Sequence, residues 1–219
     1  MSDHLRRYTD ILSLLDMLRL QRITLLDPSR WFDQNDAYGV QLYGKVKGQG
    51  RVVALCLAEG VEQAHHWQLF AGHNHGVCIH FDKSELIQHL DRFSDELLHG
   101  PVIYESRARL DARETLDLNT LPFLKSEEFA AEKEYRLVAW ERWEMIAGPF
   151  TLPLPANLIK SVEFGPSMPA NLAGTASLMI DEMPWCREIE FYRSALGSSD
   201  GWRNSISRIA TGFGCSISR

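Results

Sequence analysis

The sequence predicts a single domain of the α+β (mixed α/β) class, with a central mixed or split β-sheet flanked by short helices. Short apolar runs, each typical of a buried strand, alternate along the chain with segments whose apolar residues recur at helical spacing. The helical segments are too irregular for a doubly wound parallel sheet. The 219 residues suffice for one domain with a substantial core. We therefore predict one domain over 5–195.

The first elements have clear local signals. A helix over 11–18 is predicted to begin at Asp10, whose side chain suits an N-cap. A strand over 22–26 ends at a proline turn, because proline fixes φ and pushes the preceding residue out of the helical region. Residues 31–39 are rich in side chains that hydrogen-bond their own backbone and predict an ordered loop. An exposed turn over 44–50 is expected next.

Apolar periodicity places the remaining elements. The near-continuous apolar run at 52–57 predicts a central strand that is buried on both faces. Asp82 is predicted to cap a helix that ends near Ser94. The other expected elements are a helix over 62–71, strands over 75–81 and 101–104, a helix over 105–118, a proline-marked loop over 149–155, a strand over 161–164, a helix over 170–183 and a strand over 188–192.

Composition bounds the location and the partners. The formal net charge of −6 gives no global basic field of the kind that nucleic-acid-binding proteins show. No run approaches the ~18 apolar residues that cross a bilayer, so no membrane partner is expected. The first ten residues are charged and lack the apolar core of a secretory signal, which predicts a cytoplasmic protein. The cysteines are widely separated and are predicted to be reduced: Cys56, Cys78, Cys186 and Cys215.

The end of the chain differs from the rest in composition. Residues 196–219 form a serine- and glycine-rich tail that carries a local excess of positive charge. Such a composition has too few apolar residues to build a core of its own. Disorder and partner binding are the two alternatives for this tail.

The most informative stretch is KSEEFAAEKEYRLVAW, residues 125–140, which begins with a helix-like pattern and ends in a strand-like apolar run. Glu132 and Glu134 lie at the join. Two residues spaced i, i+2 point to opposite faces of a strand, or diverge by roughly 200° around a helix. We therefore expect only one of the two glutamates to face a pocket, and we prefer Glu134, next to the strand. Arg136 follows as an expected ion-pair partner.

Histidines form a second cluster, His65, His66, His73, His75 and His80, within 16 residues. Adjacent helical residues diverge by about 100°, so His65 and His66 do not readily face one ion, and no metal site is expected. A metal-assisted nuclease built on this cluster is an alternative function. A non-catalytic recognition module that holds a partner through its aromatic and histidine loops is another, motivated by the tail and by Trp31, Trp67, Trp140 and Trp143.

Five stretches resemble the bacterial domain-of-unknown-function family 2971, and together they cover about residues 5–195. The most specific are the segment around Trp67, Phe70 and HGVCIHFD, and the E-x-E-x-R motif of Glu132, Glu134 and Arg136. The other matching stretches are LRRY, RITLLDPSRWFDQND with its Asn35-Asp36 pair, and LIKSVEFGPSM. The resemblance implies relatedness and leaves the activity open.

The same motif is similar to the E-x-E strand entry of ADP-ribosyltransferases of the arginine–serine–glutamate type. That resemblance implies NAD as the substrate, a nucleic acid or protein as the target, and no metal. It implies an early arginine, Arg6 or Arg7, for the pyrophosphate and a late glutamate that stabilises positive charge on the ribose. The catalytic residues that it implies are Glu134, Glu132 and Arg136. The residues expected to bind the nucleotide are Arg7, Tyr8, Asn35, Asp36, Trp67 and His75.

Overall fold

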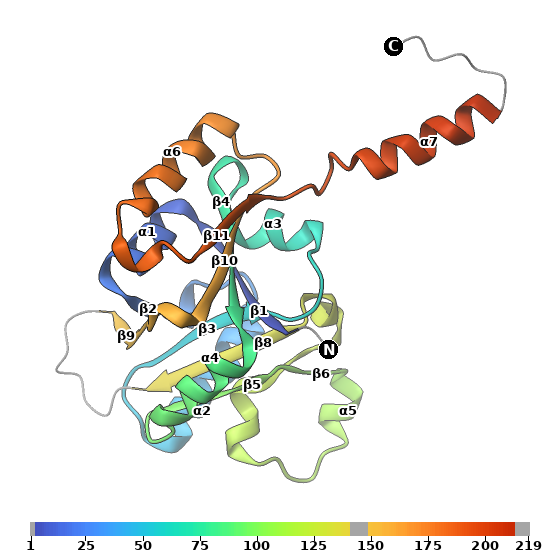
Figure 1. Ribbon diagram of the computed structural model, residues 1–219. Helices are drawn as coiled ribbons and strands as arrows, with labels where there is room; N and C mark the ends of the chain where they lie inside the picture. The colour runs from blue at the N-terminus through green and yellow to red at the C-terminus, as the bar shows by residue number, and fades with distance from the viewer. Residues whose placement is uncertain (1–2, 141–148, 213–219) are drawn as a thin grey trace.

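The computed structural model describes residues 3–140 and 149–212, so Trp143 and Cys215 lie outside the described residues. The protein is a single domain in which helices flank one large mixed sheet, which confirms the predicted fold class (Figure 1). Among the described helices, none is long and apolar enough to cross a lipid bilayer. The boundary predicted at residue 195 stays a prediction.

Seven strands form the main sheet. Neighbouring strands pair in antiparallel orientation except β10 and β11, which are parallel. The segment His4–Asp10, to which the sequence analysis assigns no element, lies at the centre of the sheet. Across the sheet the order is β11 (Glu190–Arg193), β10 (Ile159–Phe164), β4 (Gly76–Asp82), β1 (His4–Asp10), β3 (Val52–Ala58), β8 (Glu134–Trp140) and β5 (Leu97–Pro101).

Two small sheets accompany the main one. β2 (Arg22–Leu25) pairs antiparallel with β9 (Phe150–Pro153), and β6 (Ile103–Glu105) pairs parallel with β7 (Leu124–Ser126). The strand β9 falls in the segment that we predicted to be a proline-marked loop, so that prediction was wrong. Proline is tolerated there because β9 has one partner strand, and an edge strand does not need every N–H for pairing.

Aspartate caps fix the predicted helix starts at Asp10 and Asp82. Asp10 accepts from Ser13 N at 2.9 Å, and Asp82 accepts from Glu85 N at 3.0 Å. The described α-helices are α1 (Ile11–Leu20), α2 (Gln34–Lys47), α3 (Ala64–Phe70), α4 (Lys83–Leu90), α5 (Arg107–Asp111), α6 (Ala170–Asp181) and α7 (Asp200–Gly212). The described 3-10 helices are η1 (Pro28–Arg30), η2 (His73–His75), η3 (Asp91–Phe93), η4 (Leu118–Phe123), η5 (Glu127–Glu132), η6 (Ala156–Leu158) and η7 (Pro184–Cys186).

Helix α2 occupies the segment for which we predicted a loop and an exposed turn. The aspartate that suggested a loop is the N-cap: Asp33 accepts from Asn35 N and Asp36 N. Gly48, with φ 64, ends the helix in the left-handed conformation. Tertiary packing decides the outcome, because Val40 and Tyr43 are buried against the main sheet. The side chains that cap the ends of this helix were interpreted as signs of a loop, so the loop prediction was wrong.

Two other segments differ from the sequence-based expectation. The helix predicted over 105–118 forms only as the single turn α5, which buries none of its residues and so gains little from packing. In the serine- and glycine-rich tail, residues 200–212 form α7. Its apolar residues Trp202, Ile206 and Ile209 recur at helical spacing and are exposed, and the helix projects from the domain (Figure 1).

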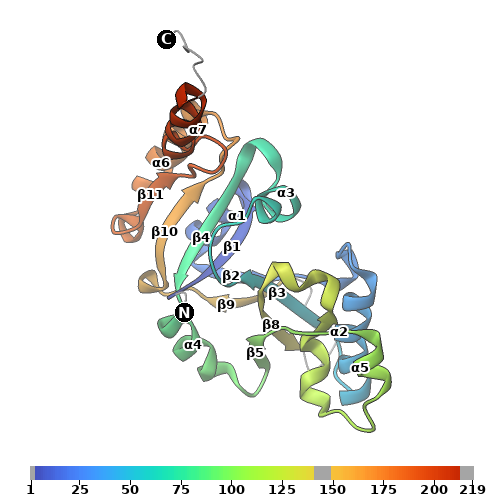
Figure 2. The same ribbon diagram turned by 90° about the vertical axis from the view of Figure 1, so that its right-hand side faces the viewer.

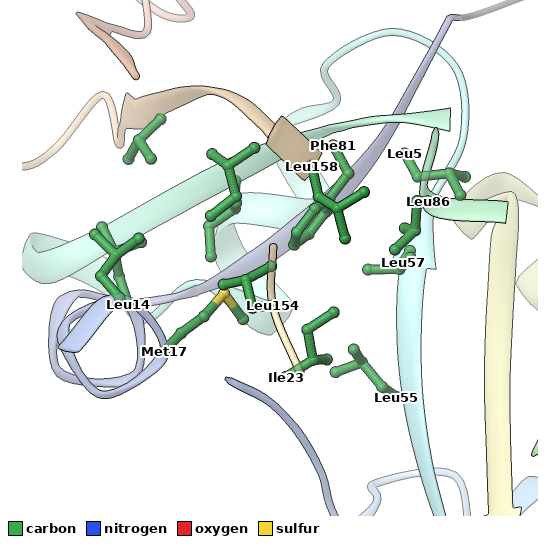
Figure 3. Packing of buried hydrophobic residues seen from close by; sticks show 14 of the residues in the cluster. Leu5, Leu14, Met17, Ile23, Leu55, Leu57, Phe81, Leu86, Leu154 and Leu158 are labelled. Atoms are coloured by element: carbon green, nitrogen blue, oxygen red, sulfur yellow. The ribbon is translucent and has the colours of Figure 1, made fainter. Parts of the chain in front are cut away.

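The two sides of the main sheet carry different side chains. One side, which we call the α1 face, bears Leu5 and Leu55 and packs against α1 and α6 in the main apolar core (Figure 3). The opposite side, the α3 face, bears Tyr8 and Ala58 and packs against α3. Figure 2 shows α3 beside β1 and β4, with α2 beside β3 and β8.

Substitutions at two glycines are expected to change the stability of the protein in opposite directions. A Cβ on Gly76 would lie 2.7 Å from Ala71 O and 2.8 Å from Gly72 O, which are backbone atoms that cannot move aside cheaply. Gly76→Ala is therefore expected to destabilise the protein by about 2–3 kcal/mol. Gly174→Ala, inside α6 with open space around it, is expected to stabilise by about 0.5–1 kcal/mol. Urea unfolding of both variants measures the difference, and equal effects would contradict the described contact.

Candidate functional site

Five charged side chains are buried together where β8 begins, and we call them the charge cluster. Its members are the carboxylates of Asp36, Glu132 and Glu134 and the cations Lys125 and Arg136. Each is at most 10% exposed at the side chain. Burying charges is costly unless they are paired, so such a group persists only where the geometry satisfies most of it.

Arg136 is the centre of the charge cluster and is fully buried. Its Nη1 and Nη2 donate to the two oxygens of Asp36 at 2.7 Å each, a bidentate pair, and Nη2 also donates to Glu134 at 2.8 Å. Nη1 donates to Pro122 O at 2.8 Å, and the guanidinium lies 4.9 Å from the Trp31 ring centre. Of the two expected ion-pair partners of Arg136, Glu134 and Glu132, Glu134 is the one it contacts.

Lys125 joins the two glutamates. Its Nζ donates to Glu132 at 2.6 Å and to Glu134 at 2.5 Å. The expectation that the two carboxylates point in opposite directions was therefore wrong. The reason lies between them: Lys133 has φ 47, a left-handed conformation that ends η5 and turns both carboxylates to the same side.

The two glutamates ionise differently although they share a cation. Burial raises the pKa of Glu132 to about 7, and its hydrogen bond to Glu134 adds to the shift. Burial alone would also raise the pKa of Glu134, but Arg136 and Lys125 hold it well below its usual range. The charge cluster thus combines a permanently ionised carboxylate with a carboxyl that exchanges its proton near neutral pH.

An aromatic group adjoins the charge cluster on the α3 face. The Tyr8 ring lies 5.0 Å from Trp67 and 4.9 Å from His66. His66 Nε2 is 3.1 Å from the Glu132 backbone oxygen, which ties the two groups together. Burial lowers the pKa of His66 to about 4, so its imidazole is neutral at pH 7. Trp67 also lines a cavity of about 370 Å³ between α3 and residues 196–198.

The structure separates the two early arginines. Arg6 pairs across β1 and β3 with Ala58, and Ala58 pairs with Glu134 of β8, so Arg6 and Glu134 share the α3 face. Arg7 points to the α1 face, where it lines a cavity of about 280 Å³ with α1 and β2. Burial lowers the pKa of Arg7 to about 10, while Asp10 and Asp16 oppose the shift. Arg7 is therefore not brought together with the glutamates.

Two other predicted residues lie apart from the charge cluster. Asn35 is exposed, and its backbone N–H donates to Asp33 at the start of α2. His75 is exposed at the end of η2. The structure thus brings together Asp36, Glu132, Glu134 and Arg136, and beside them Tyr8 and Trp67.

Sequence reasoning selected neither Lys125 nor His66 for this site, and for the pyrophosphate it chose Arg7, with Arg6 as the alternative. A signal existed for Arg6, because residues spaced i, i+2 on a strand share a face, and Tyr8 was already selected. If the segment LRRYT is taken as a strand, Arg6 lies on the same face as Tyr8, and Arg6 is selected instead of Arg7. No comparable signal marked Lys125, whose position opposite the glutamates depends on β7 and η5.

A separate set of side chains could hold a metal ion, although no metal site was expected. Cys78, His80 and Glu163 are buried on the α3 face, with one ligand atom of each within 4.8 Å of the others. Of the histidine cluster, His80 takes part in this group. Sequence reasoning missed it because Glu163 comes from a distant strand.

The fold and the charge cluster define the class: a single mixed α/β domain with a buried acidic and basic network on one sheet face. Residues 66–137 match the family model DUF2971, described as a protein of unknown function. The match confirms the resemblance to that family over this range, which includes Trp67, Glu132, Glu134 and Arg136. No curated protein matches the chain.

Proposed function

We propose that the protein is an NAD-using enzyme of the ADP-ribosyltransferase type, or an NAD glycohydrolase, and that it acts at the α3 face beside the charge cluster. The observation that carries the proposal is the pair Glu132 and Glu134, joined by Lys125 but ionised differently. Pairs of carboxyls whose pKa values are driven apart are typical of acid–base sites. The acceptor for the transferase is a protein or a nucleic acid.

The chemistry assigns distinct roles to the two carboxyls. Cleavage of the nicotinamide–ribose bond develops positive charge on the ribose, which carboxylates stabilise electrostatically. Glu132, with a pKa of about 7, is suited to take the proton of the attacking hydroxyl or water as general base. Glu134 and Arg136 are positioning residues in this proposal, because Arg136 is fully buried and holds Glu134 against Lys125.

The neighbouring side chains suit a dinucleotide. Arg6 lies two strands from Glu134 at the same level of the sheet, about 10 Å away at the usual strand spacing, and a guanidinium binds a pyrophosphate bidentately. The Arg6 side chain also donates to Gly60 O, which orients it. Trp67 and Tyr8 offer aromatic surface for a flat ring. Arg6 takes the place that the sequence analysis gave to Arg7.

The bacterial cytoplasm is part of the same proposal. Cys56, Cys78 and Cys186 are free thiols, as expected in a reducing compartment. The family resemblance implies a bacterial source.

The test is release of nicotinamide from labelled NAD by the purified protein, with and without cell extract as a source of acceptor. We expect Glu132→Gln to lower the rate by ~10²–10⁴-fold, the usual contribution of a general base. Arg6→Gln is expected to raise KM for NAD, whereas Arg7→Gln, on the opposite face, is the matched control and should leave KM unchanged. Unfolding midpoints verify that each variant is folded.

Negative results with the wild-type protein would exclude the proposal. No NAD binding, no nicotinamide release and no labelled product with the wild-type protein would exclude the proposal. If Glu132→Gln and Glu134→Gln variants also kept every cellular effect of the protein, a non-catalytic recognition module would be the better description.

A further inference from the structure

We propose that Cys78, His80 and Glu163 form a zinc-binding site on the α3 face, distinct from the charge cluster. The three residues are 0%, 5% and 6% exposed, and their ligand atoms all lie within 4.8 Å of one another. They contribute one sulfur, one imidazole nitrogen and one carboxylate oxygen, which is a donor set that zinc accepts.

Strand geometry places the three ligands. Cys78 and His80 are two residues apart on β4, so both side chains leave the same face. Glu163 of β10 pairs directly with Cys78 in the antiparallel register, which brings its carboxylate beside both. Paired strands in the middle of a sheet hold side-chain positions more precisely than loops do. The site is therefore built into the fold before any ion binds.

Distances are close to those that zinc needs. Zinc bonds of ~2.0–2.3 Å in a tetrahedron place ligand atoms ~3.5 Å apart. His80 Nε2 lies 3.2 Å from Glu163 Oε2, and the whole set spans at most 4.8 Å, so small side-chain rotations suffice. Tyr192, whose hydroxyl is 3.2 Å from His80 Nε2, is 43% exposed. Three protein ligands leave the fourth position open for water or a substrate.

Charge balance favours a divalent ion. A thiolate at Cys78 and a carboxylate at Glu163 together neutralise Zn²⁺. Zinc binding releases the Cys78 thiol proton, and His80 binds through Nε2 with its proton on Nδ1.

An ion pair between His80 and Glu163 is a simpler explanation of why these two of the three residues lie together. It gives no role to Cys78, whose thiol would then be an ordinary buried apolar group. The two accounts therefore differ in what Cys78 does, and a cysteine variant separates them.

The experiment uses the full chain, stripped with a chelator and then titrated with Zn²⁺ and, separately, with Co²⁺. We expect one zinc per chain by elemental analysis and, with Co²⁺, a sulfur-to-cobalt charge-transfer band. Cys78→Ser should abolish that band, and Cys78→Ser and Glu163→Gln should each weaken Zn²⁺ binding at least ~100-fold, more than loss of a supporting hydrogen bond costs. Cys186→Ser, a buried cysteine elsewhere in the core, is the matched control and should bind normally.

Near-UV circular dichroism of each variant establishes that it is folded. Failure of the wild-type protein to retain zinc, or Zn²⁺ binding by folded Glu163→Gln with unchanged affinity, would overturn the proposal. A cobalt spectrum without the sulfur band would overturn it as well. These readouts measure metal rather than NAD chemistry, so the outcome is independent of the proposed function.

Discussion

Replacing Arg136 with methionine is expected to lower the free energy of unfolding by about 3–5 kcal/mol, the cost of breaking a buried ion pair from one side. The guanidinium makes four hydrogen bonds, two to Asp36, one to Glu134 and one to Pro122 O. Methionine fills a similar volume but leaves two buried carboxylates without their main partner. Urea unfolding at pH 7 measures the loss.

The control for this variant is Arg22→Met. Arg22 also makes a bidentate contact, with Asp16, but the two side chains are 31% and 43% exposed. Solvent screens such a pair, so its loss should cost at most about 1 kcal/mol. The double variant Asp36→Asn, Arg136→Met should recover part of the stability, since it removes one stranded charge. A loss below about 1 kcal/mol for Arg136→Met alone would contradict the described network.

The second large effect is a pH dependence caused by Glu132. Its pKa is about 7 in the folded protein against 4.5 in the unfolded chain. Between these values the folded state binds more protons than the unfolded state, so stability falls as the pH rises from about 4.5 to about 7, by roughly 3 kcal/mol at most. The contribution of Glu134 to stability has the opposite sign, because the pKa of Glu134 is lowered in the folded protein. This stabilisation is present above pH 4.5 and is lost as the pH falls further.

Variants separate the contribution of Glu132 to the pH dependence of stability from the contributions of other groups. His66, with a pKa lowered to about 4, makes stability rise with pH over part of the same range, so the wild-type profile alone is not diagnostic. The difference between Glu132→Gln and wild type removes that background. We expect Glu132→Gln to gain stability relative to wild type as the pH rises toward 7 and above. Glu128→Gln, an exposed glutamate of the same 3-10 helix, should follow the wild-type profile, and a Glu132→Gln profile parallel to wild type would refute the shift.

The sequence predicted much of the secondary structure where apolar pattern and capping agree. The runs that became β3 and β4 are apolar enough to require burial, and Asp10 and Asp82 begin helices as N-caps anywhere in a protein. The loop predicted at the start of α2 was wrong, since the same aspartate chemistry serves both a loop and a helix start. Only the packing of Val40 and Tyr43 against the sheet distinguishes them.

For the candidate site, the sequence by itself determined the acidic motif, the arginine that follows it and the aromatic residue Trp67. Their spacing along one chain is visible without a fold. Tertiary structure alone decided that Asp36, a hundred residues from Arg136, completes the charge cluster, and that Glu132 and Glu134 both turn toward Lys125. It also chose Arg6 over Arg7, because strand pairing fixes which face a side chain occupies. Local sequence sets chemistry and capping, whereas faces and long-range contacts follow from how the strands pair.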